Sequence, residues 1–277
     1  MTDAGRPVTL KVATWNVHEG VPVRPGGDPA RELARFLAGV DLVALQEVAL
    51  TPDGGFAEGG PLAGTGLNHR VTFPMSASAM FADRRMGVAI LSRWPCREVR
   101  RVVLPNPDLR ASAGGREFAS HDKGLLAVQV QVGDRALWFA TVHVFPFHKF
   151  NRDPRDPAFG KVWQELADSV DALRKLPGRP VLIGGDFNTE HRELLTGRLA
   201  GRWRRGVTGA TTYRRIESDD VIYSSELELR GTRVIPTFSD HDLCVCEFVL
   251  QAPAAAAAAA KSSNARGGRP SARGTPS

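Results

Sequence analysis

Short apolar runs separated by turn-forming residues dominate the sequence. The runs at residues 10–15, 42–45, 88–91, 125–132, 137–142, 181–183, 221–223 and 243–249 have the length and residue types of β-strands. Within residues 125–132, apolar side chains alternate with Gln129 and Gln131, which predicts a strand with one buried face. Residues 137–142 are apolar throughout, so we expect that strand at the centre of a sheet.

Only two segments have the three- and four-residue apolar spacing that indicates a helix. The first is predicted to begin at Asp28, whose carboxylate can accept from exposed amides, with Pro29 in the first turn. The second spans residues 157–176, and its apolar stripe indicates packing rather than a cofactor site. Two helices among many strands imply sheets packed on each other with helices outside.

We expect residues 1–251 to form one domain, with a glycine-rich loop at residues 51–68. Residues 252–277 are rich in alanine and basic residues and lack apolar periodicity, which predicts a disordered tail. A tail that binds nucleic acid or another partner is the alternative. The chain carries 36 Lys and Arg against 30 Asp and Glu, and four of the bases lie in this tail, so the excess is weak evidence for a polyanion partner.

The composition, 42% hydrophobic and 24% charged, is typical of a globular protein, and no apolar run approaches the roughly 20 residues needed to cross a bilayer. We therefore expect no membrane span. The first residues lack the features of a secretory signal, which favours the cytoplasm. Cys96 stands alone, and Cys244 and Cys246 lie within one expected strand, where packing explains them better than a disulfide.

Polar residues that can bind a cation or a phosphate follow four of the apolar runs and precede the last one. Each can be explained singly as a turn residue, a helix cap or a buried histidine. Five such sites, each joined to an expected strand, indicate instead that loops gather them on one rim. They are Asn16, Glu47, His143, the pair Asp186 and Asn188, and the triplet Ser239, Asp240 and His241.

The segments TWNVHEG, LVALQEV, GVAILSR, KGLLAV, ATVHV, VLIGGDFNT, DDVIYSS and SDHDLCVCEF resemble the ordered motifs of the endonuclease/exonuclease/phosphatase superfamily, which includes the DNase I-like nucleases. The resemblance runs from about Lys11 to Phe248, and GGDFN with an upstream LQE and a downstream SDH is a specific combination. It implies an α/β fold, the DNase I-like four-layer sandwich, in which two mixed β-sheets pack face to face with helices outside.

The resemblance also implies a magnesium site, with Mn²⁺ as an alternative ion. Glu47 would be the principal ligand, because hard divalent cations prefer oxygen donors, and Asn16 and Asp240 would complete or flank the site. Asp186 would orient and deprotonate the attacking water, and Asn188 would contact the same water or the phosphate. This pair shares a face if the chain leaves the strand in extended form.

His241 would stabilise the phosphoryl group, and the resemblance makes Asp220 the carboxylate that orients it, with Asp219 less suited. His143 would donate to the phosphate. Lys123 either supplies a cation to the phosphate or is a solvated lysine beside a turn.

We therefore expect a monomeric metal-dependent phosphoesterase whose partner is a phosphodiester, with nucleic acid favoured and a nuclease as the first choice. Arg198, Arg202, Arg204 and Arg205 surround Trp203 and suit a backbone-contacting, base-stacking patch, but a core anchor with arginines facing water is the slightly favoured interpretation of Trp203. The alternatives are a small-molecule or phospholipid phosphodiesterase or phosphatase, and a non-catalytic nucleic-acid-binding module.

Overall fold

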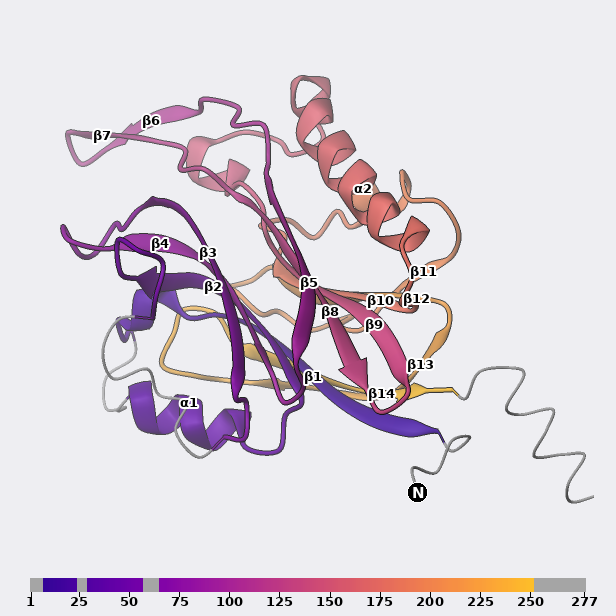
Figure 1. Cartoon of the computed structure of the whole chain (residues 1–277). Helices are drawn as coiled ribbons and strands as arrows, with labels where there is room; N and C mark the ends of the chain where they lie inside the picture. Colours follow the sequence, from indigo (N-terminus) through magenta and orange to yellow (C-terminus); the bar gives the residue numbers. More distant parts are fainter. Residues whose placement is uncertain (1–6, 24–28, 57–64, 252–277) are drawn as a thin grey trace, which may run out of the picture.

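The computed structural model describes residues 7–23, 29–56 and 65–251 (Figure 1). The predicted tail, the predicted cap Asp28 and the middle of the glycine-rich loop lie outside these residues. Within the described part, no helix is long and apolar enough to cross a membrane. Cys96, Cys244 and Cys246 are free thiols there, and Cys244 and Cys246 are buried in the core, so the expectation that packing explains this pair is confirmed.

Two six-stranded sheets form the body of the protein. The first has the order β13 (Leu227–Ile235), β14 (Leu243–Leu250), β1 (Val8–Asn16), β2 (Leu42–Leu50), β4 (Arg85–Ser92) and β3 (His69–Ala77). The second has the order β11 (Trp203–Arg205), β12 (Asp219–Ser224), β10 (Val181–Asp186), β9 (Arg135–His143), β8 (Gly124–Val132) and β5 (Cys96–Val103). Each sheet contains one parallel pair, β1 with β2 and β9 with β10, so both sheets are mixed.

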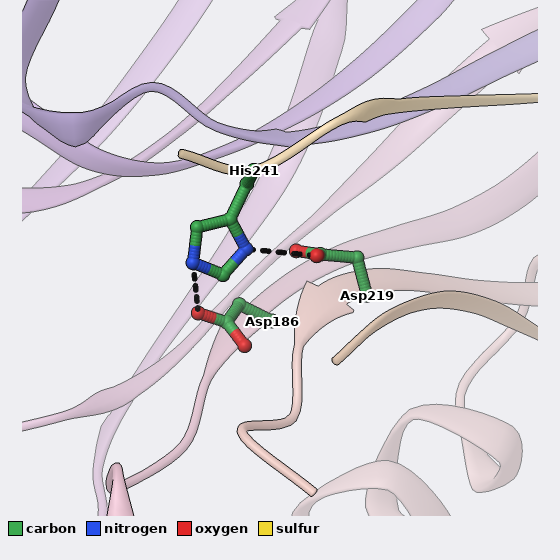
Figure 2. Close-up of side chains that lie close together, drawn as sticks. All are labelled: Asp186, Asp219 and His241. Carbon is green, nitrogen blue, oxygen red and sulfur yellow. Dashed lines mark hydrogen bonds and ion pairs between the residues drawn. The ribbon is translucent and has the colours of Figure 1, made fainter. Parts of the chain in front are cut away.

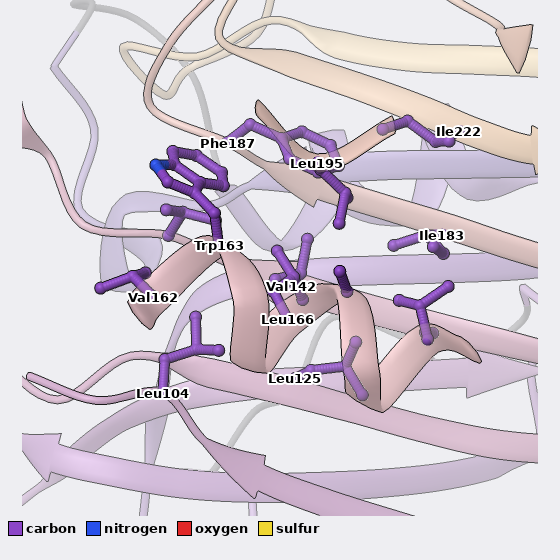
Figure 3. Close-up of a cluster of buried hydrophobic side chains, with 14 of the residues drawn as sticks. Leu104, Leu125, Val142, Val162, Trp163, Leu166, Ile183, Phe187, Leu195 and Ile222 are labelled. Carbon is purple, nitrogen blue, oxygen red and sulfur yellow. The ribbon is translucent and has the colours of Figure 1, made fainter. Parts of the chain in front are cut away.

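Helices cover the outer faces of this pair of sheets. The long helices are α1 (Pro29–Leu37) and α2 (Gly160–Lys175), and the short ones are η1 (His18–Gly20), η2 (Phe147–Phe150), η3 (Pro157–Phe159) and α3 (Glu193–Thr196). The predicted second helix is therefore a short η3 turn followed by α2. The stripe of α2 packs through Val162, Trp163 and Leu166 onto Leu125, Val142 and Ile183 of the second sheet (Figure 3).

Three apolar clusters separate the four layers. One lies between α1 and the first sheet, one between the sheets, and one between the second sheet and α2. Burying a side chain of the size of Trp163, which is 2% exposed, stabilises a fold by roughly 1.5–3 kcal/mol or more. The expected four-layer α/β sandwich is confirmed.

All eight predicted strands are present, and the apolar strand predicted to be central, β9, lies inside its sheet. The strands that the pattern missed are β3, β5, β11, β13 and the separate hairpin of β6 (Arg110–Ala113) with β7 (Arg116–Ala119). These are edge strands or a projecting hairpin, and most of their side chains reach solvent, so the apolar signal is weak. The prediction that β8 has one polar face was wrong, because Gln129 is buried and donates to the Pro177 carbonyl at 2.7 Å.

The two glycines before Asp186 allow close packing on both faces of β10. A β-carbon on Gly184 would lie 2.8 Å from the Ala44 side chain of the facing sheet, and one on Gly185 would lie 2.4 Å from Val142. Both distances are far shorter than ordinary packing distances. A larger residue at Gly184 would therefore push the two sheets apart, and one at Gly185 would push β10 away from β9. The sheets are thus held closely together immediately before the strand reaches its last residue.

Candidate active site

The candidate site is the last, polar layer of the space between the two sheets. A β-carbon on Gly184 of β10 would point at the first sheet. Alternate residues of a strand share a face, so the side chain of Asp186 also points toward the first sheet. His143 is paired with Asp186 in the parallel register of β9, and Asp219 is paired with it in the antiparallel register of β12. The register therefore places three polar side chains on one face at one end of the sandwich.

A polar layer joins the sheets directly beneath these side chains. The Gln46 amide donates to the Thr141 hydroxyl at 2.9 Å and to the Thr14 hydroxyl at 3.2 Å, and all three side chains are buried. These hydrogen bonds fix β2 against β1 and β9 at the point where the chain turns toward Glu47. The apolar core between the sheets ends at this layer.

Asp186 is the centre of the site. Its Oδ1 accepts from the Ser218 hydroxyl at 2.6 Å and from the Asn188 amide N–H at 2.9 Å, and its Oδ2 accepts from the Asn16 side chain at 3.0 Å. Burial raises the pKa of this carboxyl, but the facing imidazoles and these hydrogen bonds outweigh it and hold the pKa well below its usual value. Asp186 is therefore a fixed, charged carboxylate.

His241 lies between two carboxylates (Figure 2). Its Nδ1 is 2.8 Å from Asp219 Oδ2, and its Nε2 is 3.7 Å from Asp186 Oδ2. Burial lowers the pKa of His241, but the carboxylates outweigh burial and raise it to about 10. The imidazole is thus positively charged, and it is oriented by Asp219. The Tyr213 ring stacks on it at 4.4 Å and 24°.

The prediction that Asp220 orients His241 was wrong. The Asp220 carboxylate points to the other face of β12, where Oδ2 accepts from Arg205 Nε at 2.7 Å and lies 3.4 Å from Arg192 Nε. Its Oδ1 accepts from the Val207 amide at 2.9 Å. Adjacent residues of a strand face opposite sides, so only Asp219 can reach the site.

The arginine beneath Asp220 braces the chain that carries the site. Arg192, 2% exposed, donates through Nη2 to the carbonyls of Glu217 and Ser218 at 2.7 and 2.9 Å, and its Nη1 donates to the Thr189 carbonyl. Its guanidinium lies 4.5 Å from the centre of the Phe187 ring. The Asp220 carboxylate therefore acts on the site through the backbone that presents Ser218.

His143 and Lys123 form the second half of the site. His143 Nε2 lies 3.5 Å from Asp186 Oδ2 and 3.7 Å from Glu47 Oε1. Lys123 Nζ lies 3.1 Å from each ring nitrogen of His143. Burial and the Lys123 charge lower the pKa of His143 to about 3, so this imidazole is neutral. Lys123 is only 3% exposed, which rules out the solvated lysine that was one alternative.

Glu47 occupies a strained backbone position. Its φ of 49° lies in the left-handed region, at the irregular register of β2 between Leu45 and Val48. Burial raises the pKa of its carboxyl, but Lys123, His143 and further positive charges outweigh burial and lower it to about 2. Among the described residues, no side chain donates a hydrogen bond to this carboxylate, and its 18% exposed side chain faces a cavity.

These features fit a divalent cation at Glu47. A charged carboxylate without a hydrogen-bond donor offers free oxygen lone pairs, which is what Mg²⁺ and Mn²⁺ require. The Asn16 segment is tied to the Asp240 segment, because the Ser239 hydroxyl donates to the Asn16 carbonyl at 2.8 Å. Asn16 Oδ1 accepts the His18 amide at 3.1 Å and keeps a second lone pair.

A second group of possible ligands is a less suitable metal site. One atom each from Asp186, Asp219 and His241 lie within 4.8 Å of one another, and all three residues are buried. However, both imidazole nitrogens face carboxylates, and a positively charged imidazole has no lone pair for an ion. The group is better interpreted as a charged histidine held between two acids.

Asn188 does not continue the strand. β10 ends at Asp186, and Asn188 has a φ of 52°, so the assumption that the pair leaves the strand in extended form was wrong. The side-chain amide still reaches the site, because Nδ2 lies 3.3 Å from Asp186 Oδ2 while donating to the Val144 carbonyl at 2.9 Å. Phe187 lies in the apolar core.

Sequence reasoning missed several residues that support the site. Thr212 accepts the Ser218 and Asp219 amides on its hydroxyl at 3.0 and 2.8 Å, and Ser218 in turn holds Asp186. Glu19 is 5% exposed and accepts the Ala79 amide at 3.0 Å. In the sequence, Ser218 could have been noticed because it directly precedes Asp219 and Asp220. Thr212 follows no apolar run, so no signal pointed to it.

The arginine-rich segment is not a single basic patch. Trp203 lies on the edge strand β11 and packs against the core beside α2, with Arg174 5.6 Å from its ring centre. Arg205 is engaged by Asp220 and, at 2.6 Å, by Glu217. The reading of Trp203 as a core anchor is therefore the better one.

The sequence model of the Endonuclease/Exonuclease/phosphatase family matches residues 13–241, which include every residue of the site. No curated protein sequence matches the chain. An endonuclease/exonuclease/phosphatase from Beutenbergia cavernae DSM 12333 is similar in structure, with a TM-score of 0.66, 20% identity, and coverage of 89% of this chain and 73% of that one.

Two further solved structures share the fold. ANGEL2, a 2',3'-cyclic phosphatase, has a TM-score of 0.58 at 14% identity, covering 88% of this chain and 96% of its own. TDP2 of D. rerio, complexed with a single-strand DNA product, has a TM-score of 0.55 at 18% identity, covering 87% of this chain and 98% of its own. At these identities the likeness concerns the fold.

Proposed function

Because the chain belongs to the Endonuclease/Exonuclease/phosphatase family, and so to hydrolases that act on phosphoester bonds, we propose that it is a nuclease dependent on a divalent metal. The observation that carries this proposal is the convergence on Asp186. The neutral imidazole of His143 and the positively charged imidazole of His241 lie 3.5 and 3.7 Å from its carboxylate. Glu47 lies 3.7 Å from His143.

Asp186 positions the attacking water. Its carboxylate is held by four donors from three segments, Asn16, Asn188 and Ser218, and its lowered pKa keeps it charged at neutral pH. A lowered pKa makes it a weak base. It therefore suits the orientation of a water molecule and the transient acceptance of its proton.

The two histidines play different roles because their charges differ. His241 is an imidazolium and stabilises the negative charge that develops on the phosphoryl oxygens. His143 is neutral and donates one N–H to a phosphate oxygen, while the buried Lys123 ammonium beside it adds positive charge. Asn188 can donate to the same phosphate or water when its amide gives up the 3.3 Å contact with Asp186 Oδ2.

Glu47, with Asn16 and Asp240, is proposed to hold Mg²⁺, or alternatively Mn²⁺. Such an ion supplies Lewis-acid stabilisation of the phosphoryl oxygens and the leaving group. The protein's own contribution is the strained backbone at Glu47, which aims the carboxylate into the cavity instead of into the core.

A nucleic-acid substrate is favoured over the other phosphodiesters. TDP2, which shares the fold, is complexed with single-strand DNA. The buried Lys123 and the exposed Lys149 beside Glu47 provide positive charge for a phosphate backbone. The likeness to ANGEL2, a 2',3'-cyclic phosphatase, supports a small phosphoester as the second candidate. A non-catalytic module is disfavoured, because each proposed catalytic position carries a competent side chain.

Hydrolysis assays on plasmid, single-stranded DNA, RNA and phospholipid test the proposal. The purified protein is expected to cleave nucleic acid with Mg²⁺ or Mn²⁺ and to stop when a chelator is added. Asp186→Ala and His241→Ala are expected to lower kcat by about 10²-fold or more, the usual effect of removing a group that acts on the transition state.

Circular dichroism of both variants controls for unfolding. Glu165→Ala, an exposed change on α2 far along the chain from the site, is the matched control and should keep full activity. Unchanged turnover in both Asp186→Ala and His241→Ala would refute the assignment of the site.

A further inference from the structure

A cavity of about 200 Å³ opens directly beside Glu47. Its lining comes from η1, from the turn between β3 and β4, from the end of β7 and from η2. The hairpin of β6 and β7 projects from the body of the sheets in Figure 1 and ends at this cavity. Of the proposed metal ligands and catalytic groups, only Glu47 and Lys123 line it, so most of this space has no role in the proposed hydrolysis.

One wall of the cavity is apolar and partly uncovered. Phe118 of β7 lies at the mouth, 37% exposed, with its ring 5.3 Å from the Phe150 ring at 46°. Met80, on the turn between β3 and β4, is 45% exposed and lines the same cavity. Val23 and Val103 are the other large apolar side chains that are exposed in the described residues, so half of this set surrounds one cavity. Exposed apolar side chains grouped in this way mark a binding surface.

Other residues of the lining carry positive charge suited to a phosphate. Lys123 reaches the cavity from a buried position, and His121 and Lys149 line it from exposed positions. Glu47 also lines the cavity. A ligand suited to this lining presents a flat or apolar group to Phe118 and a phosphate to Lys123 and Lys149.

We propose that this cavity binds the single unpaired nucleotide attached to the scissile phosphate, with Phe118 as the platform on which its base stacks. The proposal rests on the proposed nuclease function and narrows its substrate to single-stranded DNA or RNA. A base offers a flat aromatic face to Phe118, and stacking of this kind is tolerant of sequence.

The size of the cavity decides against a duplex. Its 200 Å³ lies below the roughly 300–1,000 Å³ of pockets that hold drug-sized ligands, which suits one base better than a base pair. A base in a duplex would have to leave its stack to reach Phe118, which costs a few kcal/mol. Single-stranded substrates avoid this cost.

Steady-state kinetics of Phe118→Ala test the proposal with short oligonucleotides of DNA and of RNA. The substitution is expected to raise KM for single strands by about 5- to 100-fold and to leave kcat within about threefold, because stacking is made in the ground state and the transition state alike. Phe118→Trp keeps an aromatic face and should restore KM. Val103→Ala is the matched control, an exposed apolar side chain that does not line the cavity.

A backbone that lacks all bases separates stacking from a general defect. On an oligonucleotide made entirely of abasic residues, the unmodified protein and Phe118→Ala should have the same KM within about twofold. A loss of the same size on both substrates would show that Phe118 only supports the fold of the hairpin. Preference of the unmodified protein for duplex over single strand would also overturn the proposal, as would phospholipid cleavage that depends on Phe118.

Equilibrium binding distinguishes failure of this proposal from failure of the proposed function. Fluorescence anisotropy with a labelled single strand, in the presence of chelator, measures binding without cleavage. If the protein cleaves no nucleic acid but Phe118→Ala still weakens this binding by about 5- to 100-fold, the nuclease function fails and the base-binding cavity stands. Equal binding by the two proteins overturns the cavity assignment.

Discussion

Asn substitutions at the adjacent Asp219 and Asp220 should have different effects. Asp219→Asn should lower activity, and Asp220→Asn should lower stability. Asp219→Asn removes the charge that accepts from His241 Nδ1 at 2.8 Å, whereas Asp220→Asn removes the charge that engages Arg205 at 2.7 Å and Arg192 at 3.4 Å. Both carboxylates are fully buried and differ by only one position in β12. The two variants therefore differ mainly in the face of β12 from which a carboxylate is removed.

The expected loss of activity in Asp219→Asn follows from one charged hydrogen bond. Hydrogen bonds to charged groups contribute about 1.5–3 kcal/mol, which corresponds to a factor of about 10 to 150 in rate. The loss can approach about 10⁴-fold if the Asn amide also fixes His241 in the wrong tautomer, as happens when an orienting aspartate is replaced in serine proteases. The protein should remain folded.

Asp220→Asn should act mainly on stability. Arg192, 2% exposed, would keep its buried charge without a carboxylate, and breaking one partner of a buried ion pair costs about 3–5 kcal/mol. Arg205 retains Glu217 at 2.6 Å and is partly exposed, so its share of the cost is smaller. The folded fraction should turn over substrate within a few-fold of the original rate.

Urea unfolding and kcat on a single-stranded oligonucleotide, measured for both variants, check these expectations. Rates are normalised to the folded fraction at the assay temperature. An Asp220→Asn protein that is stable but inactive, together with an active Asp219→Asn protein, would restore the original assignment and refute the geometric argument.

Two further changes test the metal site and the packing beneath it. Glu47→Gln should raise the Mg²⁺ concentration needed for half-maximal activity by at least about tenfold, because a hard cation loses its charged oxygen ligand; an unchanged Mg²⁺ titration would place the ion elsewhere. Gly184→Ala should destabilise the fold by about 1–3 kcal/mol in urea unfolding, because its new methyl group would lie 2.8 Å from the Ala44 side chain; a neutral effect would mean that the sheets can separate without cost.

The alternation and continuity of apolar residues were enough to determine the framework. Strands such as β9 and β10 are buried on both faces, so their sequences are apolar runs that end abruptly at a polar residue. The strand ends therefore indicated Asn16, Glu47, His143 and Asp186 without any coordinates. Edge strands such as β5 and β13 face solvent, and their mixed sequences contain no comparable signal.

Only the tertiary structure decided which acid orients His241. The sequence contains two adjacent aspartates, and a strand directs neighbouring side chains to opposite faces, so one of them must face away from the site. The choice depends on the register between β12 and β10, which pairs Asp219 with Asp186 and Asp220 with Gly185. That register is set by packing between segments more than 30 residues apart, and no local pattern in the sequence encodes it.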